Sequence, residues 1–234
     1  MKLGIMQPYL FPYIGYFQLI ESCDCFVVYD DVQYIKNGWI NRNRILLNGK
    51  IHYITLPVLK NGSLLSINQR VFSYEFELHK RSLLSKIEQA YRKAPFFKGV
   101  YDMVEECFQS TDSNVAVFVT QTIQKCCEFL GIKTPFVIAS ALDIDSKLRA
   151  EERVISINKI LKADAYINPV GGIELYSREK FAANGIDLRF LRSRLPTYSQ
   201  FEQNFIPALS ILDVMMFNTL DEIRSSLVEY DLVA

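Results

Sequence analysis

The chain has 234 residues, of which half are apolar and 22% are charged, a composition typical of a soluble globular protein. Its 26 basic and 26 acidic residues give a formal net charge of zero, which argues against general binding to nucleic acid or to a membrane surface. Its five cysteines are an odd number without paired spacing, so the sequence indicates neither a disulfide framework nor a zinc site.

The N-terminal segment predicts neither export nor membrane insertion. Pro8 and Pro12 interrupt it before a long apolar core forms, and it carries a single lysine, unlike a signal peptide. No apolar run approaches the roughly 18 residues that a membrane-spanning helix needs. We therefore expect a cytoplasmic protein without membrane partners.

The first 31 residues predict the start of a parallel sheet. Apolar runs at 2–6 and 25–29 are typical of strands, and a segment opened by Pro12 has apolar residues at helical spacing. In open α/β sheets, ligands bind beyond the carboxyl ends of the strands. The polar residues that follow these two strands should therefore share one rim, which is our candidate active site. They are Gln7, Tyr9, Tyr13, Asp30 and Asp31.

The next segment predicts a hairpin and then three consecutive helices. Two runs of strand character, 44–47 and 51–58, flank Asn48-Gly49, a strong two-residue hairpin signal. Periodic apolar residues, caps and stops then predict the helices. These helices cover 76–91, 98–108, and a span capped by Asp112 or Ser113 and ended by Gly131.

The rest of the chain alternates strand and helix patterns at short spacing, which argues for more parallel sheet. The expected strands lie at 135–140, 165–168 and 186–191, and the expected helices at 151–161, 177–183, 210–217 and 221–229. The predicted fold class is thus α/β: a mainly parallel, Rossmann-like sheet with a β-hairpin and a helical insertion at about 74–131. We expect one domain over residues 1–234.

The loop after the first strand is the first candidate for ligand chemistry. Tyr13-Ile14-Gly15-Tyr16 occupies the place where nucleotidylyltransferases and class I synthetases carry a His-x-Gly-His signature, whose glycine lets a nucleotide approach the helix N-terminus. Both histidines are tyrosines here, and tyrosine has no cation to steady phosphate charge. The alternative is a helix start whose aromatic rings pack into the core.

A second candidate is the polar segment 36–44, which combines cations, amides and the only tryptophan. Arg42 and Arg44 are two apart, so on a strand they share a face. Guanidinium groups suit phosphate or carboxylate, and with Trp39 they would fit a nucleotide, a sugar phosphate or the phosphopantetheine of an acyl carrier. The alternative is a solvated hairpin edge. The residues expected to bind substrate are Trp39, Asn41, Arg42, Asn43 and Arg44.

Glycines and carboxylates give further candidates. Gly171 and Gly172 follow a predicted strand and precede a helix, where they would allow a ligand to approach the backbone or would form a plain turn. Asp30 or Asp31 could act as a base or hold a metal or a ribose, or could serve only as turn residues. Asp213 lies in an apolar helix and should have a partner, with a cap or a salt bridge as the expected role.

Histidines and cysteines contribute less. If a histidine is the general base, His79 is the choice, because His52 lies in the second hairpin strand. The five cysteines are expected to be small apolar fillers. The sequence leaves the cofactor unknown, and we nominate no residues as a metal site.

Several stretches, in order, resemble the WbqC-like protein family: IMQPYLFPYIGYF, FVVYDDVQYIKNGWINRNRI, HKRSLLSKIEQAYRKAPFF, YSREKFAANGIDLRFL and FIPALSILDVMMFN. The resemblance covers nearly the whole chain. It implies a cytoplasmic enzyme that modifies or assembles an activated sugar, because bacterial genes of this family often lie among those for O-antigen and other surface polysaccharides. Tyr13 stands where members commonly have tryptophan. The positions that match the strongest motifs are Gln7, Pro8, Tyr9, Pro12, Gly15, Tyr16, Asp30, Asn41, Arg42 and Asn43.

The leading hypothesis is a transferase that acts on a nucleotide-linked amino sugar, with an acyl or aminoacyl group delivered from a carrier. Arg42 and Arg44 would hold phosphate, the two tyrosines of the first loop would line the sugar or base pocket, and Asp30 or His79 would take a proton from the attacking amine. One alternative is nucleotidyl or adenylyl transfer through the Tyr13–Tyr16 loop. Another is a non-catalytic binding protein of a polysaccharide assembly complex.

Overall fold

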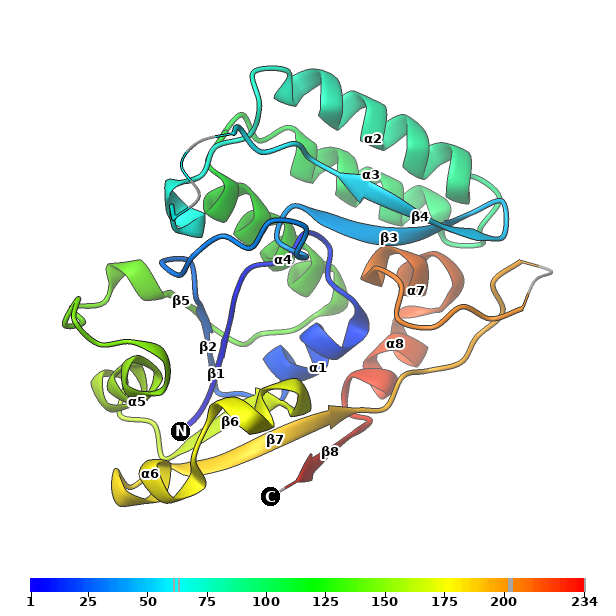
Figure 1. Ribbon diagram of the computed structural model, residues 1–234. Coiled ribbons are helices and arrows are strands. Elements are labelled where there is room, and N and C mark those ends of the chain that lie inside the picture. The colour runs from blue at the N-terminus through cyan, green and yellow to red at the C-terminus, as the bar shows by residue number, and fades with distance from the viewer. Residues whose placement is uncertain (61, 63, 202–203, 234) are drawn as a thin grey trace.

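A six-stranded sheet in the order β5-β2-β1-β6-β7-β8 organises the chain (Figure 1). The computed structural model describes residues 1–60, 62, 64–201 and 204–233. The first five strands in the sheet order are parallel, and β8 pairs antiparallel with β7. This confirms the predicted α/β class. The strands are β1 (Lys2–Met6), β2 (Cys25–Val28), β5 (Phe136–Ile138), β6 (Ala165–Pro169), β7 (Asp187–Ser193) and β8 (Tyr230–Val233).

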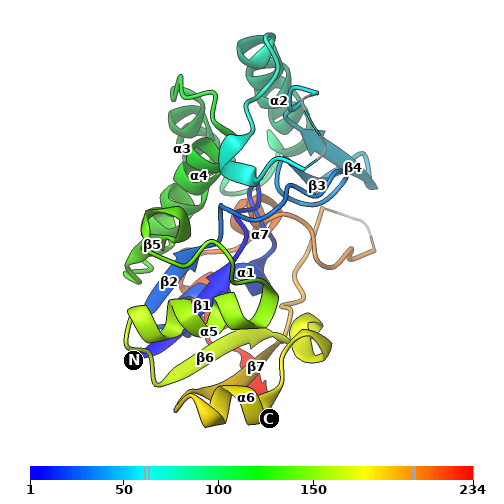
Figure 2. The same cartoon turned by 60° about the vertical axis from the view of Figure 1, so that its left-hand side comes forward.

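Helices cover both faces of this sheet, because side chains of the central strands alternate between two apolar cores. Leu3 and Ile5 of β1 face a core shared with α5 and α6, whereas Phe26 and Val28 of β2 face the core of α1 and α8. Figure 1 shows the two helix layers on opposite sides of the sheet, and Figure 2 shows α5 in front of it. The helices are α1 (Ile14–Glu21), α5 (Ala150–Ile160), α6 (Arg178–Ala183) and α8 (Leu220–Leu227).

The chain order places a topological switch point between β1 and β6. From β1 the chain passes through α1 to β2 on one side, and from β6 it passes through α6 to β7 on the other. Ligands in open α/β folds bind beyond the carboxyl ends of strands at such a point. The segments that leave this edge begin at Gln7 and at Val170.

The hairpin forms a separate two-stranded sheet, β3 (Arg42–Leu47) with β4 (Lys50–Thr55). Asn48 and Gly49 form the turn with positive φ values of 50° and 69°, as the Asn-Gly signal predicts. In Figure 1 the hairpin lies beyond one end of the parallel sheet, next to the first helix that follows it in sequence. The Leu10 amide donates to the Trp39 carbonyl (3.2 Å), so the loop after β1 and the segment before the hairpin are neighbours.

Three helices follow the hairpin in sequence: α2 (Phe76–Tyr91), α3 (Phe97–Phe108) and α4 (Val115–Leu130). α3 packs against α7 (Ile211–Phe217), and α4 packs against α8. Asn114 is the N-cap of α4, not Asp112 or Ser113, because its side chain accepts from the Val117 amide while Asp112 accepts from the Asn114 amide. Gly131 ends α4 with a φ of 80°.

The remaining differences from the sequence prediction lie at element ends. α8 ends at Leu227, and residues that follow form the edge strand β8, which the sequence did not indicate. Short 3₁₀ helices η1 (Ile67–Gln69), η2 (Ala139–Ala141) and η3 (Val170–Leu175) lie between larger elements. The five cysteines are buried and free, as expected of apolar fillers. Within the described residues, every helix is too short or too polar to cross a membrane.

Candidate functional site

The loop after β1, the segment before β3 and the first residues of β3 enclose a cavity of about 180 Å³, which we call the aromatic pocket. Its wall is mostly apolar and carries one cation. It is lined by Tyr9, Pro12, Tyr13, Trp39, Asn43, Arg44 and Ala208. Five of these residues are among those that the sequence nominated for substrate binding, and the fold brings them together from two separate segments.

Asn43 holds the β1 loop in place from the hairpin side. Its Nδ2 donates to the carbonyls of Leu10 (2.9 Å) and Phe11 (2.8 Å), and the Ser210 hydroxyl also donates to the Phe11 carbonyl (2.7 Å). Phe11 has a φ of 41°, which is unfavourable for a residue with a side chain. The three hydrogen bonds hold this loop, and with it Tyr9 and Tyr13, at the pocket. Asn43 is therefore a positioning residue.

Two arginines of β3 stack with the aromatic side chains of this region. The Arg44 guanidinium carbon lies 5.3 Å from the centre of the Trp39 ring, and Arg44 donates to the Ala208 carbonyl (2.7 Å). The Arg42 carbon lies 5.9 Å from the same ring and 4.8 Å from that of Tyr53. Within the described residues the buried Arg44 Nε has no acceptor. Cation–π contacts thus hold both guanidinium groups near Trp39.

Arg42 also lines a second cavity of about 490 Å³, which we call the basic pocket. Its cations are Lys36, Arg42, Lys60 and Arg70, and its other polar side chains are Tyr34, Asn37, Asn41 and Thr55. Asn41 accepts from the Tyr34 hydroxyl (2.8 Å) and donates to the Leu56 carbonyl (2.8 Å), so its amide is committed to the wall. The Arg42–Trp39 stack connects the two pockets.

The sequence did not single out Tyr34, Lys60 or Arg70, which line the basic pocket. Lys60 and Arg70 come from the segment between β4 and α2, and Tyr34 precedes the polar segment 36–44. Lys60 and Arg70 could have been noticed as cations that follow the arginine cluster in the sequence. Only the path of the chain after β4, however, shows that they fold back beside Arg42.

Gly15 and Tyr16 support the first loop from within. A Cβ on Gly15 would lie 2.4 Å from the Ser193 hydroxyl and 2.4 Å from the Tyr13 ring, so the glycine is required by close packing. The buried Tyr16 hydroxyl donates to the Gln7 carbonyl (2.9 Å). That hydroxyl is therefore engaged inside the protein. Gln7 itself follows β1 and does not line the aromatic pocket.

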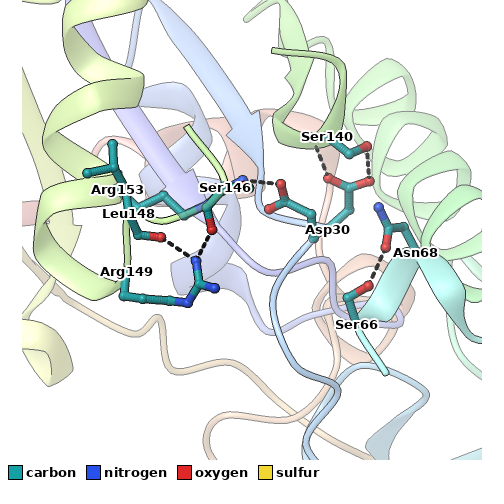
Figure 3. A network of polar contacts seen from close by, with 9 residues as sticks. Asp30, Ser66, Asn68, Ser140, Ser146, Leu148, Arg149 and Arg153 are labelled. Atoms are coloured by element: carbon teal, nitrogen blue, oxygen red, sulfur yellow. Dashed lines mark hydrogen bonds and ion pairs between the residues drawn. The ribbon is translucent and has the colours of Figure 1, made fainter. Parts of the chain in front are cut away.

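The carboxylates after β2 are engaged by the protein itself (Figure 3). Asp30 is buried and accepts from the Ser140 amide (3.0 Å) and hydroxyl (2.6 Å), which ties β2 to η2. Asp31 forms a partly buried ion pair with Arg153 of α5. Burial raises the pKa of Asp31, and the Arg153 charge opposes that rise. Asp30 borders a different cavity, of about 290 Å³, beside α4.

The other candidates lie away from both pockets. His79 of α2 lies beside Glu75, the residue before that helix, with the Nε2 of His79 3.7 Å from the Glu75 carboxylate. Gly171 and Gly172 lie in the 3₁₀ helix η3, which precedes α6 in the sequence. A Cβ on Gly172 would lie 2.1 Å from Asn168, whereas one on Gly171 would meet nothing within 4 Å. Packing therefore explains the second glycine but not the first.

Asp213 has partners, but they differ from the cap or salt bridge expected for it. Its carboxylate is fully buried and accepts from Tyr91 (2.7 Å), Tyr198 (2.8 Å) and Gln200 (2.6 Å). Burial raises its pKa, and these three hydrogen bonds oppose the rise. Neutral donors from distant segments thus satisfy the acid.

The model of the WbqC-like protein family matches residues 7–225 of this chain. The chain belongs to the WbqC-like protein family. It is also similar to a curated protein named "Uncharacterized protein Rv1507c" from Mycobacterium tuberculosis (strain ATCC 25618 / H37Rv), with 28% identity over 225 residues that cover 93% of each chain. No solved structure matches it. The expected resemblance is thereby confirmed.

In this WbqC-like protein, the matched region contains every residue that lines the aromatic and basic pockets. Burial raises the pKa of Tyr9, with the neighbouring Tyr13 adding to the effect, so the Tyr9 phenol is a hydrogen-bond donor rather than a base. Across the described residues, no group of three or more histidine, cysteine or acidic side chains gathers to hold a metal ion. The two pockets therefore present rings, phenols and cations.

Proposed function

We propose that this protein is a transferase that modifies a nucleotide-activated amino sugar for surface polysaccharide synthesis, by accepting an acyl or aminoacyl group from a carrier. The observation that carries the proposal is the aromatic pocket, in which apolar walls surround a single guanidinium group. Family membership supports the polysaccharide setting. Small-molecule sites of this kind combine apolar walls with a few placed polar groups.

The size of the aromatic pocket suits one ring of such a substrate. About 180 Å³ is enough for a sugar ring or a nucleobase but not for a whole nucleotide sugar. Trp39 is 37% exposed, so part of its ring face is accessible for stacking. The Tyr9 phenol can donate to a ring oxygen or a hydroxyl group, and Arg44 provides the positive charge.

The transfer step depends more on how the protein positions the two substrates than on a reactive group supplied by the protein. The neutral amine of the sugar attacks the carbonyl carbon of the donor, a C–N bond forms, and the carrier leaves with the bonding electron pair of the broken bond. The amine proton passes to solvent, because the aromatic pocket has no carboxylate or imidazole in its wall. Asp30 and His79 do not line this pocket, so the scheme gives neither of them the proton.

The test is to incubate purified protein with nucleotide amino sugars and acyl or aminoacyl donors and to follow product mass. We expect transfer by the wild type and a loss of at least about tenfold in kcat/KM for Trp39→Ala, the scale of one lost stacking contact. The matched control is Tyr74→Ala, because Tyr74 is an aromatic residue that is 94% exposed and lies outside both pockets.

Two outcomes would contradict the proposal. One is that no sugar and donor pair is turned over. The other is that Trp39→Ala and Tyr74→Ala transfer equally well. Binding of a nucleotide sugar without turnover would instead favour a non-catalytic member of an assembly complex.

A further inference from the structure

The basic pocket concentrates positive charge in a chain whose formal net charge is zero. Four cations line it, and none of its described lining residues is a carboxylate. Within the described part of the chain, no ion pair joins Lys36, Arg42 or Lys60 to an acid. Like charges that share a cavity repel one another, and a bound anion relieves that repulsion.

The two arginines of this pocket are held before any ligand arrives. Arg70 is only 5% exposed, its guanidinium lies 5.1 Å from the centre of the Tyr34 ring, and it donates to the Gly62 carbonyl (2.8 Å). Arg42 donates to the carbonyls of Gly38 (3.0 Å) and Asn37. Pre-placed guanidinium groups lose little conformational entropy on binding an oxyanion.

Tyr34 is close enough to both arginines of the basic pocket for their charges to act on its hydroxyl group. Burial raises the pKa of Tyr34, and the charges of Arg70 and Arg42 oppose that rise. Lys36 and Lys60 are exposed at the rim. Two fixed guanidinium groups and two exposed ammonium groups match an anion that carries several charges on adjacent groups better than they match a single carboxylate.

The position of the basic pocket suits an anion attached to a ring. Arg42 lines the basic pocket and stacks on Trp39, which lines the aromatic pocket. A molecule with one ring in the aromatic pocket would pass its linker across this stack.

We propose that the basic pocket binds the diphosphate of a nucleoside diphosphate-linked substrate, with Arg42 and Arg70 as fixed ligands and Lys36 and Lys60 as rim ligands. The identity of the attached organic group rests on the proposed function, whereas the binding of the diphosphate rests on the pocket itself. Pyrophosphate is the probe that isolates this second claim.

The test is calorimetric titration of the full chain with pyrophosphate and with inorganic phosphate. We expect pyrophosphate to bind at least about tenfold more tightly than phosphate, and the affinity to fall as salt rises. Lys60→Glu should weaken pyrophosphate binding at least about tenfold, because it inserts a negative charge beside the ligand. Lys50→Glu is the matched control, since Lys50 is an exposed lysine of β4 outside the pocket, and it should change the affinity less than about twofold.

Equal pyrophosphate binding by Lys60→Glu and Lys50→Glu would overturn the inference, as would equal affinities for pyrophosphate and phosphate. The failure of the proposed function would look different. If no transfer is found but pyrophosphate still distinguishes Lys60→Glu from Lys50→Glu, the diphosphate site stands alone. If transfer is found while both variants bind pyrophosphate equally, the proposed function is supported and the assignment of the diphosphate site is contradicted.

Tyr13→Ala provides a cross-check, because this residue lines the aromatic pocket but not the basic pocket. It should leave pyrophosphate affinity unchanged and weaken binding of a nucleoside diphosphate amino sugar. If Tyr13→Ala weakens pyrophosphate as strongly as Lys60→Glu does, the site lies in the aromatic pocket and the assignment to the basic pocket is wrong.

Discussion

The end of β2 and the start of β3 carry two charged clusters that look equally promising in the sequence, but the fold uses them differently. At β2, Asp30 is bound by Ser140 and Asp31 by Arg153, so both carboxylates are engaged within the protein. At β3, Arg42 and Arg44 contact ring faces and backbone carbonyls beside cavities. We infer that the arginines of β3 are the stronger candidates for ligand binding, because no carboxylate among the described residues pairs with them, whereas hydrogen bonds or an ion pair from the protein already occupy the carboxylates after β2.

The largest expected effect comes from removing the Asp30 carboxylate. Asp30→Ala removes a buried carboxylate and the two hydrogen bonds that it accepts from Ser140, and we expect it to lower the free energy of unfolding by about 3 kcal/mol in urea denaturation. Asp30→Asn can keep both contacts and should cost less than about 1 kcal/mol. Loss of transferase activity in a stably folded Asp30→Asn would assign Asp30 to acid–base chemistry and break the comparison.

A smaller loss is expected where an amide holds the aromatic pocket. Asn43→Ala removes the donors to the Leu10 and Phe11 carbonyls and should lower the free energy of unfolding by about 2 kcal/mol. Because the loop that carries Tyr9 loses its anchor, substrate affinity should fall as well. Asn158→Ala is the comparison variant, since the buried Asn158 donates to the Val154 carbonyl in α5 and lines neither pocket. Equal substrate affinity in the two variants would contradict the positioning role of Asn43.

Two glycine-to-alanine variants should shift stability in opposite directions. Gly15→Ala pushes a methyl group into the Tyr13 ring and the Ser193 hydroxyl, and we expect it to destabilise the protein by about 1.5 kcal/mol. Gly99→Ala, inside α3 with open space around it, should stabilise the protein by up to about 1 kcal/mol. Thermal melts of both variants measure the contrast. A neutral Gly15→Ala would mean that the Tyr13 ring is not held against α1.

The smallest expected effect is a change in pH dependence at Asp213. Burial raises its folded-state pKa, so the folded state binds the proton more tightly than the unfolded state, whose pKa is near the ordinary 3.8. The stability of the wild type relative to Asp213→Asn should therefore fall as pH rises from about 3.8 through the raised folded pKa. Urea denaturation of both proteins across this range gives the difference. A difference that does not change with pH would contradict the raised pKa.

Local patterns were sufficient to predict most of the fold. The helix α2 was predicted at its observed bounds, and the Asn48-Gly49 turn forms with the positive φ values that its residues favour. These features depend on neighbours in the chain. The strand β8 was not predicted, because it is a short edge strand that, among the described residues, pairs with β7 alone. A strand of four residues that pairs with a strand distant in the sequence has too short a pattern to be recognised from the sequence.

Part of the candidate site was also predictable, because some of its residues are neighbours in the sequence. Trp39 and Arg44 lie close together in the sequence, and both line one pocket. The convergence of Lys60 and Arg70 on Arg42 depends on how the chain turns back after β4, which no local pattern encodes. The engagement of Asp30 by Ser140 likewise joins residues 110 positions apart.

The most direct measurement is a crystal structure of the protein with a nucleoside diphosphate amino sugar. The account predicts one ring against Trp39, the diphosphate between Arg42 and Lys60, and Asp30 still bound to Ser140. A ligand seated against Asp30, with the Ser140 contact broken and both pockets empty, would contradict it.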